Sequence, residues 1–328
     1  MLFWDWLRSA IMRRRKGKAM YTKKKSIFQI ISADFQRHKW KYLIIIPVIV
    51  YFILFDYKPM YGVIIAFKRY SASKGVMDSP WVGLKQFERF LGDPYFWKTL
   101  LPNTLTINIL DVIFSFPVPI LLALLLNEVK VPWFKKIIQT LTYLPHFIAA
   151  VVMCGLIATY CQTNGLFNDI AVFFGARRSN LLADSDNYYF IYTASDIWKS
   201  AGWGSILYLS ALAGIDQDQY EAARIDGAGR FKQLIYITLP GLSSMIIMKL
   251  IMRVGHLLKG GGQKTLLLYQ PLTYDVADVI SSYVYRKGMV DGDYSFSTAV
   301  GMFNSVINII LLVSANKVAK KAGDSGIF

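Results

Sequence analysis

The chain has 328 residues, of which 54% are hydrophobic. Several apolar stretches approach or exceed the roughly 20 residues that a helix needs to cross a bilayer, which favours one polytopic membrane domain over two soluble domains. The formal net charge is +16, and 12 of the 37 Lys and Arg residues lie in residues 1–41, ahead of the first apolar run. Basic residues gathered beside a membrane span are typical of a cytoplasmic flank, so we do not expect a nucleic-acid-binding surface.

Residues 1–41 form a basic leader that we expect to be cytoplasmic. The start of the chain does not match a secretory signal, because its charges follow the short apolar stretch and no small-residue cleavage site is present. Residues 1–12 carry Trp4 and Trp6, which suit a short helix lying at the membrane surface. An irregular leader explains the same residues equally well.

Six apolar segments predict six transmembrane helices in an all-α transmembrane domain over residues 42–328. These segments are residues 42–60, 100–126, 137–161, 188–215, 242–258 and 296–316. The first is expected to bend at its outer end, near Asp56 and Lys58, and the fifth is the least clearly apolar. Pro117, Pro119 and Pro145 lie inside spans, where a missing backbone donor favours a kink.

The distribution of basic residues orients these spans. With both termini in the cytoplasm, the inner segments hold 21 Lys and Arg residues and the outer segments hold 13. The positive-inside rule therefore favours this orientation. It makes residues 216–240 a cytoplasmic loop and residues 259–295 an outer loop.

Cysteines and histidines give no indication of a disulfide, a metal site or an enzyme. Cys154 and Cys161 are seven residues apart, which is about 10 Å along a helix and too far for a disulfide. The three histidines have no metal-ligand spacing, and no catalytic arrangement is recognisable. We expect a transport protein without a cofactor, a metal or a catalytic residue of its own.

The most specific motif is the stretch EAARIDGAGRFKQLIYITLP at residues 221–240. Its Glu-Ala-Ala, the glycine four residues later and the closing Ile-x-Leu-Pro resemble the EAA loop of binding-protein-dependent ABC importer permeases. The sequence itself predicts a short helix before Gly227, a tight turn at Gly227 and Gly229, and a second helix over residues 230–237. Pro240 is expected to open the fifth span.

The resemblance implies a type I ABC importer permease fold and a role for each motif residue. The EAA helix would dock into a cleft of a separate ATPase, with Glu221 anchoring it, Ala222 and Ala223 allowing close approach, and Gly227 making the turn. Asp226 and Pro240 belong to the same set of coupling residues.

Further stretches resemble the oligosaccharide and polysaccharide-type sugar permeases of bacteria, which places the chain in a bacterial cell membrane. They lie at residues 59–62, 82–91, 116–129, 142–149, 198–215, 274–280 and 294–303. The resemblance implies four kinds of partner: a related second permease subunit, two ATPase subunits that bind ATP and magnesium, an extracytoplasmic solute-binding protein, and a sugar. One departure is the glycine-rich polar stretch GGGQKTLLLYQP at residues 260–271, which leaves the identity of the sugar open.

Charged and polar residues within the spans are candidates for the substrate path, because such groups tend to face a cavity. Lys249 and Arg253 share one face of the fifth span and could bind sugar hydroxyls or carboxylates, so uronic-acid oligosaccharides would suit them. Further candidates are Trp198 and Trp203 for stacking on sugar rings, and Asn103 and Asn108. Alternatively, the charges pair with one another or reach an interface, and the asparagines serve helix packing.

Two other functions remain open at this stage. One is an ABC permease for another solute, such as a peptide or an amino acid. The other is an ion-coupled secondary carrier, which would leave the EAA stretch unexplained and would normally have an internal repeat.

Overall fold

The computed structural model describes residues 27–321 and Gly326, and the chain divides into two units, Met1–Gly62 and Val63–Phe328. Most of the described residues are helical, and the described part of the chain has no β-strand but only two isolated β-bridges, which confirms the predicted all-α class. The predicted surface helix over residues 1–12, and most of the basic leader, lie outside the described residues.

The first unit contains α2 (Ile27–Phe52), a π-helical turn (Ile53–Tyr57) and α3 (Lys58–Met60). The stretch Arg37–Phe67 is long and apolar enough to cross a membrane. It contains the predicted span and continues past Asp56 and Lys58 as a 3-10 helix, Tyr61–Phe67. At the position of the predicted bend, the helix changes type from α to π, back to α and then to 3-10.

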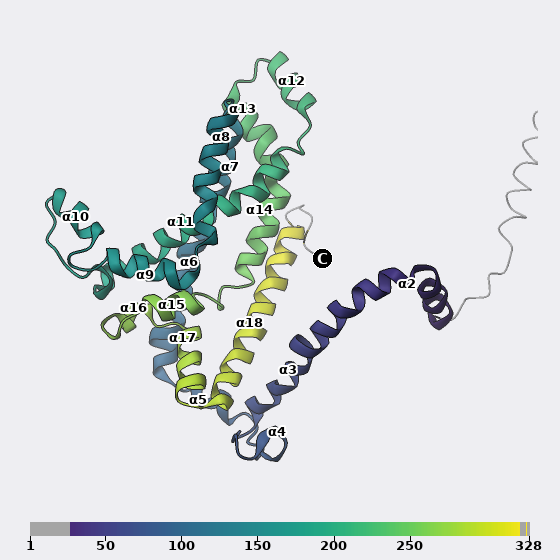
Figure 1. Cartoon of the computed structure of the whole chain (residues 1–328), viewed down its shortest axis with the longest axis vertical. Coiled ribbons are helices and arrows are strands. Elements are labelled where there is room, and N and C mark those ends of the chain that lie inside the picture. Colours follow the sequence, from purple (N-terminus) through teal and green to yellow (C-terminus); the bar gives the residue numbers. More distant parts are fainter. Residues whose placement is uncertain (1–26, 322–325, 327–328) are drawn as a thin grey trace, which may run out of the picture. The chain divides into compact units, whose positions relative to one another are not determined.

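The second unit contains fifteen of the described α-helices, with short π and 3-10 turns between them (Figure 1). They are α4 (Gly75–Asp78), α5 (Lys85–Leu91), α6 (Leu101–Leu110), α7 (Pro117–Glu128), α8 (Pro132–Tyr143), α9 (Ala150–Tyr160), α10 (Leu166–Phe173), α11 (Ser185–Leu212), α12 (Gln217–Ile225), α13 (Arg230–Gln233), α14 (Leu239–Val254), α15 (Gly262–Leu268), α16 (Tyr274–Ala277), α17 (Ile280–Tyr285) and α18 (Tyr294–Lys321). Within this unit α12 lies at one end, and α4 and α5 lie at the other (Figure 1).

Four helical stretches among the described residues are long and apolar enough to span a membrane, and a bent pair would make a fifth. Besides Arg37–Phe67 they are Phe96–Glu128, Arg230–Val254 and Tyr294–Lys321. The predicted third span is the bent pair, with an angle of 98° between Pro132–Phe147 and Ala150–Tyr160. The predicted fourth span corresponds to α11, which has 28 residues but whose Asp196 and Lys199 reduce its apolar character. The predicted number of six is thus not confirmed.

The fifth predicted span has different limits in the structure. We expected a separate short helix over residues 230–237 and a new start at Pro240, but one helical stretch runs from Arg230 through Pro240 to Val254. It ends four residues before the predicted limit at residue 258. The part of the EAA motif from Arg230 onward therefore belongs to the same continuous helical stretch as α14.

A recurring backbone feature explains how prolines are accommodated in these long helices. The residue before each of four prolines donates its N–H to the carbonyl five residues earlier, in a π-helical turn; the pairs are Lys58 to Ile53, Leu101 to Phe96, Phe116 to Asp111, and Leu239 to Leu234. A proline ring clashes with the carbonyl of the preceding helical turn, and widening that turn relieves the clash. The helix continues through the proline without breaking.

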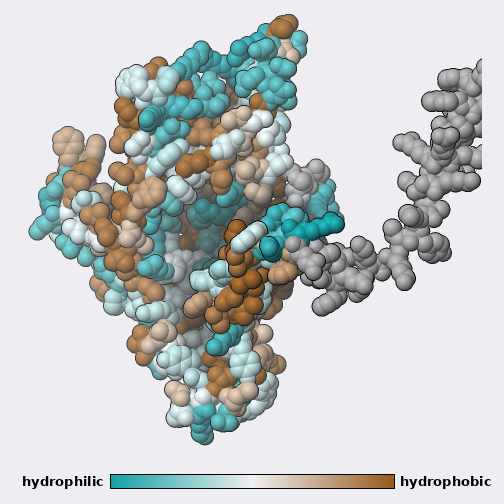
Figure 2. Space-filling model, turned by 45° about the vertical axis from the view of Figure 1, so that its right-hand side comes forward, coloured by the Kyte–Doolittle hydropathy of each residue, from teal (hydrophilic) through white to brown (hydrophobic). Residues whose placement is uncertain are grey.

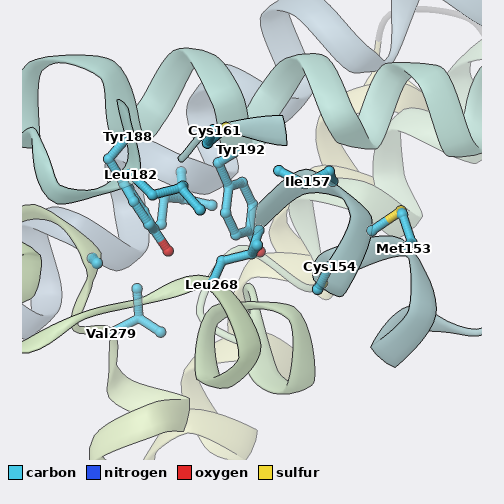
Figure 3. Close-up of a cluster of buried hydrophobic side chains, with 11 residues drawn as sticks. Met153, Cys154, Ile157, Cys161, Leu182, Tyr188, Tyr192, Leu268 and Val279 are labelled. Atoms are coloured by element: carbon cyan, nitrogen blue, oxygen red, sulfur yellow. The ribbon is translucent and has the colours of Figure 1, made fainter. Parts of the chain in front are cut away.

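Buried side chains form three clusters in the second unit. One joins α9 and α11 to the segment after α14, through Met153, Cys154, Tyr188, Tyr192 and Leu268 (Figure 3). Both cysteines are buried and unbridged, as expected. A second cluster is built on Phe90, Phe96 and Phe296, and a third joins α7, α11 and α14.

Residues 259–295 are not an open loop. They form α15, α16 and α17, and they contribute Leu268, Val279 and Ile280 to the buried clusters. The glycine-rich stretch that departs from the family pattern is therefore folded into the core, where its Lys264 contacts α11.

Candidate functional site

The EAA segment is a compact helix-turn-helix with both ends of its first helix capped. The Asp216 carboxylate accepts a hydrogen bond from the N–H of Asp218 at 3.1 Å and so caps the start of α12. At the other end, the N–H of Ala228 donates to the Ala223 carbonyl at 2.8 Å and the N–H of Gly227 to that of Arg224 at 3.1 Å. This is the Schellman pattern, which ends a helix with a residue in the left-handed conformation.

Gly227 is the residue that takes this conformation, with φ of +74°. A Cβ at this position would meet no atom within 4 Å, so the requirement for glycine is purely conformational. The expectation that Gly229 also needs glycine's freedom is wrong, because its φ is −69° and it simply precedes α13.

The outer surface of this segment combines exposed charges with exposed apolar side chains. Ile225 is 87% exposed and Phe231 is 73% exposed. Among the predicted coupling residues, Glu221, Ala222 and Asp226 are exposed and Ala223 is half-buried. Figure 2 shows mainly hydrophilic residues around α12 at the top of the molecule and hydrophobic residues on the surface below them. An apolar tip within a polar end suits a groove on another protein.

Two contacts hold this segment on the helix that continues into the apolar region. The Tyr220 hydroxyl lies 3.0 Å from the Thr238 hydroxyl, and the Gln233 side chain donates to the Ala228 carbonyl at 2.8 Å. Thr238 belongs to the π-helical turn before Pro240, which is exposed at the second position of α14. The EAA helix, the turn and α14 are thus mechanically joined.

A second candidate site is a polar cavity of about 240 Å³ between α6 and the end of α14. Its polar lining includes Asn108, Asp111, Arg253, His256 and Lys259. Arg253 forms an ion pair with Asp111, and their side chains remain 36% and 22% exposed. The cavity brings together two predicted path residues, Asn108 and Arg253. Asp111, the partner of Arg253, belongs to the π-helical turn before Pro117.

The other predicted path residues lie elsewhere. Asn103 is buried, and its amide donates to the carbonyls of Asp275 and Asp278 at 2.8 and 3.0 Å. That amide ties α6 to the segment around α16, which is the packing role left open above. Lys249 is half-buried on α14, outside the lining of the cavity.

The two tryptophans lie on α11, also outside the cavity lining. Trp203 stacks on the His146 ring with centroids 4.5 Å apart and planes at 1°, whereas Trp198 is 49% exposed.

Asp196 pairs with a residue far away in the sequence. The Lys264 ammonium lies 2.8 Å from the Asp196 carboxylate and donates to the Tyr192 carbonyl at 2.6 Å. It also lies 3.9 Å from the centre of the Tyr192 ring. Burial lowers the pKa of Lys264, and the nearby Asp196 carboxylate opposes that shift. These contacts anchor α15 on α11.

Asp278 organises the segment between α16 and α17. Its carboxylate is fully buried and accepts hydrogen bonds from Arg286 at 2.8 and 2.5 Å, from the Tyr95 hydroxyl at 2.7 Å and from the Ser282 hydroxyl at 2.7 Å. Burial and the Asp278 carboxylate raise the pKa of Tyr95 well above its usual value, so the phenol stays protonated and donates.

A comparison with known protein families decides the identity of this fold. Residues 105–323 match the family described as the binding-protein-dependent transport system inner membrane component. This chain belongs to that family. It is therefore a membrane permease subunit of an ABC importer, and the predicted family membership is confirmed.

Individual permeases are similar along nearly the whole chain. The polygalacturonan/rhamnogalacturonan transport system permease protein YteP of Bacillus subtilis is 43% identical over 293 residues, covering 89% of this chain and 91% of the relative. Protein LplB of the same organism is 44% identical over 297 residues, covering 90% and 93%. A solved bacterial alginate ABC transporter, in complex with an alginate pentasaccharide-bound periplasmic protein, superimposes with a TM-score of 0.82 at 38% identity. That match covers 90% of this chain and 99% of the other.

Several residues of this permease's cavity were not among the residues predicted from the sequence. Asp111 lies within the predicted second span, but its partner Arg253 belongs to another helix and no sequence spacing connects the two. His256 and Lys259 fall just beyond the end of α14, in a segment that the sequence divides differently. The feature of the sequence that could have indicated these two residues is the cluster of basic residues at the end of the predicted fifth span.

Proposed function

We propose that this permease subunit forms half of a path for acidic oligosaccharides in an ATP-driven importer. It works with a related second permease subunit, two ATPase subunits that hydrolyse magnesium-bound ATP, and an extracytoplasmic solute-binding protein. The observation that carries the proposal is the similarity to polyuronate transport proteins over about nine tenths of the chain. Polygalacturonan and alginate are both chains of uronic acids, so a carboxylated sugar is the common chemistry of these relatives.

The polar cavity supports an anionic substrate. Its lining holds two basic side chains, Arg253 and Lys259, and one carboxylate, that of Asp111. Charges within the apolar part of a membrane protein are costly, so they are rare and usually have a function. A carboxylated sugar would restore charge balance in such a cavity.

The EAA segment supports coupling to an ATPase. Its helix is capped at both ends, ends in a fixed turn at Gly227, and presents Ile225 and Phe231 to solvent. A short amphipathic helix inserted in a groove is a common mode of recognition between proteins. Glu221, Ala222 and Ala223 would lie against the ATPase surface, and the continuous helix through Pro240 would carry the movement into the membrane.

We also propose six membrane crossings with both termini in the cytoplasm. The bent pair α8 and α9 would form the third crossing, and α11 the fourth. The charges of α11 would be tolerated because Asp196 is paired with Lys264. This arrangement agrees with the excess of basic residues in the inner segments.

Co-purification of the ATPase tests the coupling role most directly. Detergent extracts of cells expressing the unaltered permease, the Gly227→Ala variant and the Gly229→Ala variant would be compared for the ATPase recovered. Alanine in the left-handed conformation costs roughly 1–2 kcal/mol, so Gly227→Ala should loosen the turn and lower recovery. Gly229→Ala is the matched control, because its φ is −69° and nothing lies within 4 Å of the added Cβ. Absence of an ATPase from the unaltered permease would reject the proposal.

A further inference from the structure

The cavity beside the end of α14 contains an ion pair in a position open to a ligand. Asp111 and Arg253 come from different helices, and both side chains remain partly exposed to the cavity. A structural ion pair in an apolar region would normally be shielded from solvent, because water weakens the attraction. The pair therefore stands at the cavity surface, where another anion can reach Arg253.

The surrounding basic residues make this position attractive to an anion. Lys259 lines the cavity, and no described acidic residue forms an ion pair with it. With Asp111 as the one carboxylate of the lining, Arg253 and Lys259 leave a formal charge of +1 when histidine is counted as neutral. One added carboxylate would bring the cavity to neutrality.

The segment that carries Lys259 is held in place from both sides. The N–H of Leu258 donates to the Asn308 side chain of α18 at 3.1 Å, and the Ser281 hydroxyl donates to the Gly260 carbonyl at 2.8 Å. Gly260 packs so closely on Asn108 that an added Cβ would lie 2.0 Å from the amide nitrogen. Lys259 is thus presented from an anchored turn, which reduces the entropy lost on binding.

Asp111, by contrast, lies in a segment where the regular helix is interrupted. It is the first residue of the π-helical turn before Pro117, and its carbonyl accepts the N–H of Phe116. Such turns are rare local irregularities of a helix and frequently occur at functional sites. Asp111 therefore lies at a local irregularity of its helix, whereas Lys259 lies in a segment that hydrogen bonds hold on both sides.

We propose that Asp111 is an internal substitute for the substrate, and that a uronate carboxylate displaces it from Arg253 while also contacting Lys259. This inference rests on the proposed function as an acidic-sugar permease. A carboxylate can take the place of Asp111 because a guanidinium binds carboxylates through parallel hydrogen bonds. A neutral sugar cannot break the ion pair, so the pair would select against neutral oligosaccharides.

The test uses the complete transporter, with both permease subunits, the ATPases and the binding protein, in proteoliposomes. The probes are the alginate pentasaccharide and the same pentasaccharide with its carboxyl groups reduced to alcohols. Maximal uptake of each would be measured at a saturating concentration of loaded binding protein. Binding to the detergent-solubilised complex without binding protein would be measured in parallel, because that reports the cavity itself.

Removing each partner of the pair should have opposite effects. Arg253→Gln should weaken binding of the acidic pentasaccharide about tenfold or more, through loss of a charge-assisted contact. Asp111→Asn should strengthen it several-fold, because the internal competitor is gone. The double variant Asp111→Asn/Arg253→Gln keeps the formal charge of the cavity and should retain only the weaker preference for the acidic probe that Lys259 provides.

A second pair of variants tests the cavity without changing charge. Gly260→Ala must displace the Asn108 amide and should reduce binding, whereas Gly262→Ala adds a Cβ with nothing within 4 Å and should not.

Lys259→Gln should reduce binding of the acidic probe and leave that of the neutral one unchanged.

Equal losses for both probes in Asp111→Asn and Arg253→Gln, together with lower thermal stability in both, would overturn the proposal and make the pair structural. Unchanged binding in all these variants would also overturn it while leaving the proposed function intact. Failure of the unaltered complex to take up either probe with ATP would instead reject the proposed function.

Discussion

At the scale of single residues, the fully buried Asp278 carboxylate shows how the segment between α16 and α17 is fixed. Arg286, Tyr95 and Ser282 all donate to it, and Asn103 donates to its backbone carbonyl. A buried carboxylate without its partner is far more costly than a pair that was never formed. The order of this segment therefore depends on Arg286.

We predict that Arg286→Met destabilises the permease by about 3–5 kcal/mol, because it leaves Asp278 buried and unpaired. The neighbouring Lys287→Met is the control, since Lys287 and its partner Asp291 are 33% and 48% exposed and such a pair contributes about 1 kcal/mol or less. Thermal unfolding of the purified permease in detergent would compare them. Similar midpoints for the two variants would contradict this account of Asp278.

Residue pairs are where prediction from the sequence reached its limit. The EAA motif identified the family, and the turn at Gly227 follows directly from glycine's freedom at positive φ. The partners of Asp111 and Asp196, which are Arg253 and Lys264, lie in distant segments, and local spacing contains no information about such contacts. A charge within a predicted span suggests that Asp111 and Asp196 have a partner or a function, but it does not identify the partner.

At the scale of elements, close helix packing depends on small residues. A Cβ on Gly202 of α11 would lie 2.0 Å from the Thr142 carbonyl of α8, so glycine is what allows the two helices to approach. Gly155 of α9 has open space around the same position. Both glycines lie within helices, but only Gly202 is required for close packing between two helices.

We predict that Gly202→Ala destabilises the permease by about 1–3 kcal/mol, the usual cost of overpacking a tight contact. Gly155→Ala should leave stability unchanged or raise it slightly, because alanine is the better helix former. Yield and thermal unfolding midpoint in detergent would be compared. If Gly202→Ala matched Gly155→Ala in both, α8 and α11 would not be in the close contact described.

Element limits were predicted less well than element existence, for physical reasons. Hydropathy finds the apolar middle of a helix, whereas helices such as Tyr294–Lys321 extend beyond it into polar turns. Pro240 was expected to start a new helix, but the π-helical turn before it lets the helix continue. Pro145 lies instead at a break of 98°, so proline alone does not distinguish a continuous helix from a bend.

At the scale of the whole molecule, the number of crossings is the outstanding prediction. Met77 and Ile225 are 71% and 87% exposed, and the two native cysteines are buried. Three crossings separate these positions if the bent pair and α11 each cross once. Two separate them if the bent pair returns to the side from which it entered.

We therefore predict that Met77→Cys is labelled by an impermeant maleimide only from outside the cell, and Ile225→Cys only in inside-out membranes. Labelling each variant in right-side-out and inverted vesicles would check this. The unaltered chain is the control and should remain unlabelled. Labelling of both variants from the same side would contradict six crossings.

The central claim is that ATP hydrolysis on partner subunits drives an acidic oligosaccharide through this permease. Its most direct measurement is accumulation of labelled alginate pentasaccharide in proteoliposomes that contain the complete transporter, with ATP on the ATPase side and no ion gradient. The account predicts accumulation above the outside concentration that requires hydrolysable ATP and falls sharply in Gly227→Ala but not in Gly229→Ala. Accumulation without ATP, driven by a proton or sodium gradient, would contradict it.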